Sequence, residues 1–174
     1  NYLIIFKRFS DPYFKANWIL IIILFSIDIY SKILVRNNLP LFKTTELLKN
    51  FLDLTHVQNR GVSFSLFSDL PDLIRIPFLV GVSLIAILGM MYYQFRYWNE
   101  LDIYTKTGIA FVLPGAAGNL VDRAFFGYVT DFLHFHWYEI SFFVNNLADC
   151  FISLGVIFFI VPIVFSNKFG RSPN

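Results

Sequence analysis

The sequence predicts an all-α integral membrane protein: a bundle of four transmembrane helices with a small β element on its external side. Of its 174 residues, 56% are hydrophobic and 20% are aromatic, whereas only 15% are charged. That leaves too little polar surface to cover a water-soluble domain of this size. Four segments are long and apolar enough to cross a bilayer as helices, and the two longest connections between them show the alternation that is typical of strands.

The same composition excludes several classes of protein. Disorder requires few apolar residues and many charged ones. Nucleic-acid binding requires a basic surface, which 14 basic residues against 12 acidic ones do not provide. A single cysteine excludes an internal disulfide and a multi-cysteine metal site. We therefore expect one membrane domain over residues 1–174, monomeric, without metal, cofactor or nucleic-acid partner.

The first helix resembles a signal peptide in one respect only. The expected helices cover residues 17–35, 74–97, 104–122 and 146–166. The first of them follows Lys7, Arg8 and Lys15, as the apolar part of a leader would. However, Asp28 and Lys32 interrupt its apolar run, and no small-residue cleavage site follows. We therefore expect a retained membrane helix.

The other three helices differ in their polar content. Residues 76–95 contain no charge, and residues 150–166 form a second uncharged run. The third helix contains Pro114 and runs into Asp122 and Arg123. Its apolar stretch therefore ends in charged residues.

Four spans place both termini on one side of the membrane. Basic residues are almost evenly divided between the two sides, but the three cations before the first helix favour cytoplasmic termini. The two long connections, residues 36–73 and 123–145, are then external. Alternation within residues 51–67 and 128–136 predicts short strands there.

Two ionisable residues inside the first helix point to a functional site or to a structural ion pair. Asp28 and Lys32 are four residues apart, so they share a helical face and can pair. Ionisable groups within a span are costly and indicate function by default. The pair either anchors the helix to the bundle or supports a substrate site.

The third and fourth helices carry matching polar clusters. Each contains Asn-x-x-Asp, as Asn119 with Asp122 and as Asn146 with Asp149, which places amide and carboxylate on one face. The helices are antiparallel, so both clusters lie at the same depth. Small residues such as Ala148 allow close helix approach. The clusters form either interhelical hydrogen bonds or a catalytic site.

Other candidate residues lie in the external connections or beside the acids. Asp131 is flanked by apolar and aromatic residues, so it either points back to the bundle or is an interfacial loop charge. His56, His134 and His136 lack further ligands nearby, so a metal site is not expected. Cys150 is interpreted as a buried small side chain.

Five blocks of the sequence resemble, in order and spacing, the lipoprotein signal peptidases, the type II signal peptidases of bacteria. The blocks are Asp28-x-x-x-Lys32, Asn59-x-Gly61-x-x-Phe64, Gly118-Asn119-x-x-Asp122-Arg123, Val129-x-Asp131-Phe132 and Asn146-x-Ala148-Asp149. The chain departs from the family pattern at Pro114, where Gly is usual, and at Asn145, where Phe is usual. Neither departure replaces an acid.

The resemblance implies a multi-pass aspartic endopeptidase of the bacterial cytoplasmic (inner) membrane, with its site near the outer face. Such enzymes remove signal peptides from diacylglyceryl-modified prolipoproteins, cleaving before the lipidated cysteine. The implied partners are the lipidated substrate, membrane lipid and globomycin-type inhibitors. No cofactor is implied.

The resemblance also implies roles for individual residues. The catalytic dyad falls on Asp131 and Asp149. The positions implied to bind substrate or support the site are Asp28, Lys32, Asn59, Gly61, Asn119, Asp122, Arg123, Asn146 and Ala148. Motifs alone leave Asp122 as a rival partner of Asp149. However, Asp122 adjoins Arg123, which would hold it ionised, whereas Asp131 has no adjacent cation.

Two other functions are compatible with a small membrane protein of this kind. A proton or ion transporter would use Asp28, Lys32, Asp122 and Asp149 as a relay, and it predicts polar residues at several depths. A non-catalytic assembly factor would need no converging acids. The acids of this chain crowd towards one face, which favours the peptidase.

Overall fold

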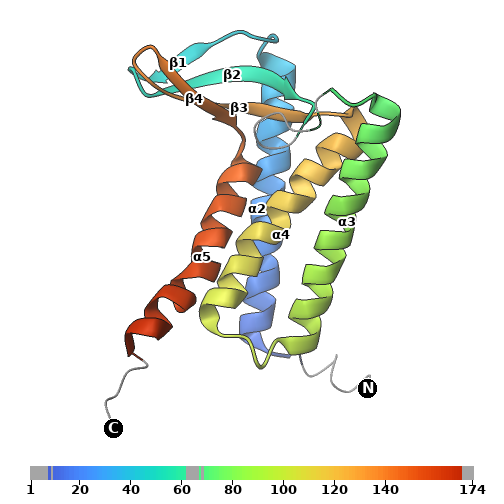
Figure 1. The fold of residues 1–174 in the computed structure, drawn as a ribbon, viewed down its shortest axis with the longest axis vertical. Helices are drawn as coiled ribbons and strands as arrows, with labels where there is room; N and C mark the ends of the chain where they lie inside the picture. The colour runs from blue at the N-terminus through green and yellow to red at the C-terminus, as the bar shows by residue number, and fades with distance from the viewer. Residues whose placement is uncertain (1–7, 9, 62–66, 68, 170–174) are drawn as a thin grey trace.

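A bundle of four helices carries a small antiparallel sheet at one end (Figure 1). The structure, a computed structural model, describes residues 8, 10–61, 67 and 69–169, so Phe64 of the second family-like block lies outside the described residues. The helices are α2 (Pro12–Asn38), α3 (Asp72–Tyr97), α4 (Ile103–Phe126) and α5 (Leu147–Phe169), and the strands are β1 (Thr45–Leu48), β2 (Leu52–Asn59), β3 (Val129–Trp137) and β4 (Ile140–Asn145).

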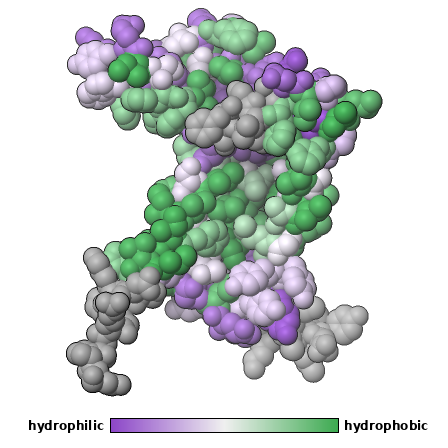
Figure 2. Space-filling view, viewed as in Figure 1, coloured by the Kyte–Doolittle hydropathy of each residue, from purple (hydrophilic) through white to green (hydrophobic). Residues whose placement is uncertain are grey.

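All four of these helices are long and apolar enough to cross a membrane. In Figure 2 their surface forms an apolar belt between hydrophilic residues at the sheet end and at the opposite end of the bundle. Large hydrophobic side chains of α3 and α5 are exposed along this belt. Such a surface is unstable in water but satisfied by lipid. The protein is therefore a multi-pass membrane protein.

Helix α2 begins at Pro12, before the residue 17 expected from hydropathy, because polar residues cap it. The Asp11 side chain accepts a hydrogen bond from the Tyr13 backbone N–H at 2.9 Å, and proline occupies the first turn. The same carboxylate accepts the Trp98 indole N–H at 2.7 Å. That bond lowers the pKa of Asp11, and it ties the start of α2 to the end of α3.

Helix α4 lies at the centre of the bundle and is the most buried of the four. It packs closely on α5 because glycines face each other. A Cβ atom on Gly108 would lie 3.0 Å from the Gly155 carbonyl oxygen, and one on Gly155 would lie 2.7 Å from the Gly108 carbonyl oxygen. Nearer the sheet, a Cβ on Gly115 would lie 2.5 Å from the Ala148 carbonyl oxygen. Small residues thus bring the two backbones together.

The turn after α4 directs the chain into the sheet. Gly127 has a left-handed φ of 76°, and its N–H bonds the Arg123 carbonyl at 3.0 Å. Such a cap favours glycine because a side chain is strained there. Strand β3 starts two residues later, so Asp131 is held close to the end of α4.

The sheet is antiparallel in the order β1-β2-β3-β4. Asp131 of β3 pairs with Val57 of β2, and Leu133 pairs with Asn145 of β4. Because neighbouring residues of a strand face opposite sides, Asp131 and Thr130 lie on opposite faces. Strand β4 then leads directly into α5, so the β3–β4 hairpin joins the positions of Asp131 and Asp149.

Candidate active site

The two acids predicted as the dyad line one cavity where the sheet meets the helices. Asp131 comes from β3, and Asp149 comes from the first turn of α5. The cavity has a volume of about 860 Å³. It is lined by both acids, by Arg123 and by the aromatic residues Phe142 and Phe143. It therefore offers acids, a cation and an apolar wall in one space.

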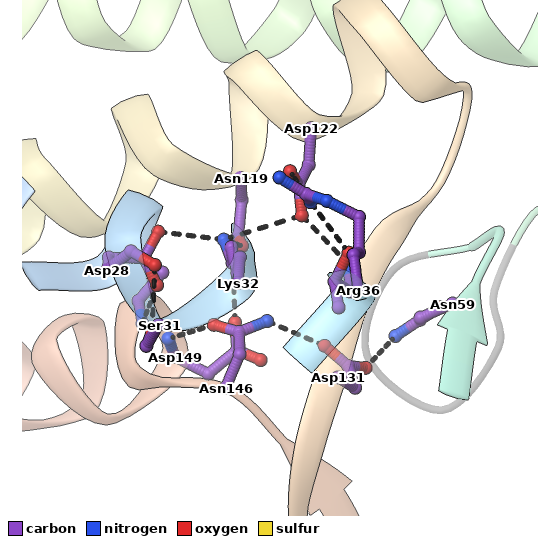
Figure 3. Close-up of polar contacts among 12 residues, drawn as sticks. Asp28, Ser31, Lys32, Arg36, Asn59, Asn119, Asp122, Asp131, Asn146 and Asp149 are labelled. Carbon is purple, nitrogen blue, oxygen red and sulfur yellow. Dashed lines mark hydrogen bonds and ion pairs between the residues drawn. The ribbon is translucent and has the colours of Figure 1, made fainter. Parts of the chain in front are cut away.

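Asp131 is almost fully buried and is held by two side-chain amides (Figure 3). Asn146 Nδ2 donates to its Oδ1 at 2.6 Å, and Asn59 Nδ2 donates to its Oδ2 at 2.9 Å. Burial, followed by the nearby charge of Asp149, raises the pKa of Asp131 to about 7. This carboxyl group therefore holds a proton for much of the time at neutral pH.

Asp149 is oriented by a different set of donors. Asn119 Nδ2 donates to its Oδ1 at 2.8 Å. The Asp149 backbone N–H donates to Asn146 Oδ1 at 3.0 Å, so Asn146 caps α5 while its amide holds Asp131. A single asparagine thus contacts both acids. The first turn of a helix also favours negative charge.

A buried lysine lies behind Asp149. Lys32 and Asp28 are 0% exposed, and Lys32 Nζ lies 2.8 Å from Asp28 Oδ2. Lys32 also donates to Asn119 Oδ1 at 2.9 Å, which makes Asn119 a bridge from the lysine to Asp149. Asp28 Oδ1 accepts the Ala148 backbone N–H at 2.9 Å. The ion pair therefore joins α2 to α4 and α5, and through Lys32 it also contacts Asn119, the residue that holds Asp149.

Asp122, the rival acid, is occupied on both oxygens. Its Oδ1 accepts from Arg36 Nη1 at 2.8 Å, and its Oδ2 accepts the Thr130 backbone N–H at 2.9 Å. Lys32 Nζ lies 3.7 Å from the same Oδ2. Asp122 is 0% exposed and is not among the residues that line the cavity.

The loop after β2 approaches the site through Arg123. Arg123 Nη2 donates to the Gly61 carbonyl oxygen at 2.9 Å. The Gly61 N–H in turn donates to Asn59 Oδ1 at 3.1 Å, while the other end of the Asn59 amide contacts Asp131. The cation, the loop and the acid are thus linked.

The structure gathers every residue that the sequence analysis predicted for the site within one network around the cavity. Two of its members were missed from the sequence: Arg36 and Thr130. Arg36 lies one helical turn after Lys32 on α2, a spacing that would have placed it on the same face. Thr130 carried no comparable signal.

The histidines lie away from the cavity. His134 and His136 stack on the sheet with ring centroids 5.1 Å apart, and their nitrogens lie 3.7 and 3.3 Å from the Asp53 carboxylate. His56 Nδ1 lies 2.7 Å from the Leu39 carbonyl oxygen. Among residues 8, 10–61, 67 and 69–169, no group of three or more His, Cys, Asp or Glu is arranged to hold a metal ion.

Comparisons with known proteins agree on one family. The family described as "Signal peptidase (SPase) II" matches residues 20–165. The lipoprotein signal peptidase of Fusobacterium nucleatum is 35% identical over 152 residues, which is 87% of this chain and 88% of the relative. That of Rickettsia bellii is 39% identical over 154 residues, which is 87% of this chain and 76% of the relative.

The solved structures share the fold. A bacterial membrane enzyme determined by the in meso method at 2.3 Å resolution superposes with a TM-score of 0.76 at 21% identity, over 92% of this chain and 95% of the other. A second such structure, at 1.9 Å resolution, gives a TM-score of 0.72 over 86% of this chain and 92% of the other. With a family match over most of its length and relatives above 30% identity, the chain belongs to the signal peptidase II family.

Proposed function

We propose that this protein is an aspartic endopeptidase that removes signal peptides from diacylglyceryl-modified prolipoproteins and cleaves before the lipidated cysteine. Asp131 and Asp149 are the catalytic dyad. The observation that carries the proposal is one cavity lined by two carboxyl groups that share Asn146, at the end of an apolar bundle. Relatives with the same family match are named lipoprotein signal peptidases.

The two acids have different roles in the proposed mechanism. Asp149 accepts a hydrogen bond from the Asn119 amide, whose oxygen faces Lys32, and it acts as the general base. Asp131, with a pKa of about 7, carries the proton. Asp149 takes a proton from a water molecule, whose oxygen attacks the scissile carbonyl carbon, while Asp131 donates a hydrogen bond to the carbonyl oxygen. The tetrahedral intermediate collapses as a proton passes to the leaving amine.

Asp122 does not take the place of Asp131 in this proposal. A general acid or base must reach the substrate, and Asp122 is buried behind the cavity with both oxygens bonded. Its role is to support the site. Arg123 and Asn59, which line the cavity, are positioned to bind the substrate backbone.

The substrate's lipid explains why the cavity lies at the edge of the apolar belt. The acyl chains stay in the bilayer while the peptide bond enters a space that water can reach. We place the site near the outer face of a bacterial inner membrane, with cytoplasmic termini. The protein acts there as a monomeric single domain that globomycin-type inhibitors bind.

The test is cleavage of a diacylglyceryl-modified precursor by the purified protein, with and without globomycin. Asp131→Asn and Asp149→Asn each remove the general acid or base, so turnover should be lost while the folded protein remains in the membrane. Asp102→Asn is the matched control, because Asp102 caps α4 through the Thr105 N–H at 3.0 Å, far from the cavity, and asparagine caps equally well.

Three outcomes would change the proposal. Wild-type turnover by either dyad variant contradicts that assignment. Loss of turnover in Asp122→Asn with intact substrate binding, beside an active Asp131→Asn, transfers the role to Asp122. Proton flux into vesicles without any cleavage supports the transporter hypothesis instead.

A further inference from the structure

Arg36 belongs to none of the five family-like blocks, yet it contacts two other elements around the site, α4 and β3. It lies in the last turn of α2. Its Nη1 donates to Asp122 Oδ1 of α4 at 2.8 Å and to Thr130 Oγ1 of β3 at 2.9 Å. Its guanidinium lies over the Phe126 ring, 4.4 Å from the centroid. The side chain is 15% exposed, so these contacts are made largely out of water.

Arg36 completes the charge balance of the buried network. Asp28 and Asp122 provide two negative charges, and Lys32 lies 2.8 Å from the first acid but 3.7 Å from the second. Arg36 is therefore the near cation of Asp122. Without it, a carboxylate with a 1% exposed side chain would depend on a lysine that Asp28 already engages. Uncompensated buried charge is strongly unfavourable.

The arginine also reaches the strand that bears the proposed acid. Residue 130 is held twice from outside the cavity: its hydroxyl accepts from Arg36, and its N–H donates to Asp122. Asp131 follows immediately and faces the other side of the strand, where Asn59 and Asn146 hold its carboxyl group. The strand is thus clamped from both faces at adjacent residues.

We propose that Arg36 is a positioning residue of the peptidase: together with Asp122 it fixes β3 at Thr130 and thereby holds Asp131 against the substrate. The inference rests on the function proposed above. Arg36 touches neither substrate nor the reacting atoms in this assignment. It acts through Thr130, whose hydroxyl it contacts directly and whose backbone N–H is held by its partner Asp122.

The test compares steady-state cleavage of the lipidated precursor by Arg36→Met, Arg36→Lys and Thr130→Val. Arg36→Met removes both the charge and the hydrogen bonds at similar bulk. We expect kcat to fall at least tenfold, because a displacement of about 1 Å near the reacting groups costs about 100-fold. KM should stay within about threefold, since the cavity lining is intact.

Two further variants separate positioning from general stability. Arg36→Lys keeps the charge beside Asp122 and should recover at least about threefold of the lost kcat. Thr130→Val removes only the hydroxyl acceptor and should lower kcat by roughly threefold or more. The kcat of the double variant Arg36→Met/Thr130→Val should fall no more than about twofold below that of Arg36→Met, because both changes break the same hydrogen bond between Arg36 and Thr130.

The control is Arg96→Met, at the other end of the molecule. Arg96 also lies over an aromatic ring, that of Tyr97 at 5.2 Å, but it is remote from Asp131 and Asp149. The kcat of Arg96→Met should therefore equal that of wild type. The proposal is overturned if Arg36→Met and Thr130→Val both keep kcat within twofold, or if lysine performs no better than methionine. If Arg36→Met does not fold, Thr130→Val decides alone. A wild-type protein that fails to cleave refutes the proposed function instead.

Discussion

Replacement of Asn59 tests the division of roles between the two acids through the pH dependence of turnover. The Asn59 amide donates to Asp131 Oδ2 at 2.9 Å and, because it stabilises the carboxylate, lowers the pKa of Asp131. In Asn59→Ala that donor is lost, so the pKa should rise above about 7. Asp131 must be protonated to act as the general acid. Turnover is therefore present below its pKa and is lost as the pH rises through it.

The size of the shift follows from the hydrogen bond. A bond to a charged group contributes about 1.5–3 kcal/mol, and one pKa unit corresponds to about 1.4 kcal/mol. Asn59 is only partly buried at the rim of a cavity, so water replaces part of the lost interaction. We expect a shift of about one unit. At pH 8 the variant should then keep about half of its maximal kcat, against about a tenth for wild type.

The assay is a pH profile of kcat between pH 5 and 10, with the lipidated precursor at saturation. Asn59→Asp is the internal control, since it keeps an acceptor for the Gly61 N–H but replaces the donor by a charge. Its alkaline limb should move further in the same direction. An alkaline limb that stays in place or moves to lower pH in both variants would refute the assignment of Asp131 as the acid.

Two further predictions concern stability. A Cβ on Gly118 would overlap the Asp28 carboxylate, so Gly118→Ala should lower the thermal unfolding midpoint in detergent by the equivalent of about 1–3 kcal/mol. Gly81→Ala is the control and should leave the midpoint unchanged, because no atom lies within 4 Å of a Cβ at that position. Equal midpoints for the two variants would contradict this packing. The hydrogen bond to the Tyr138 carbonyl, and then Asp53, raise the pKa of His136, so its protonation stabilises the fold below its unfolded pKa and that gain is lost as the pH rises through the folded one. The midpoint difference between wild type and His136→Gln should therefore be larger at pH 5.5 than at pH 8.5, and the reverse order would disprove it.

The membrane helices were predictable because hydropathy is a local property of the chain. The ends of the helices were less predictable. Helix α2 starts at Pro12, but hydropathy alone placed its start at the beginning of the apolar run, although Asp11 and Pro12 form a recognisable N-cap sequence. Capping residues lie outside that run by nature. Reading caps together with hydropathy would have found this boundary.

The site residues that stand out locally in the sequence were predictable, and those that depend on tertiary contacts were not. Lys32 and its acid were found because a charge inside an apolar run is conspicuous. Arg36 was missed because it lies at a helix end, where cations are ordinary, and its partners Asp122 and Thr130 are distant in sequence. The choice between Asp122 and Asp131 was left open by the motifs for the same reason. Which acid lines the cavity depends on the pairing of β2 with β3, which no local pattern encodes.

The hairpin that joins the two acids has a consequence for the surrounding bilayer. Membranes differ in thickness, and helices adapt to them by tilting. Asp149 lies in the first turn of α5, and the β3–β4 hairpin, registered by Leu133 against Asn145, runs from that turn back to Asp131. Asp131 is also tied to α2 and α4 through Thr130, so both carboxyl groups move together when these helices tilt as one unit. Strand register rather than helix angle sets their spacing, so turnover should tolerate lipids of different chain length.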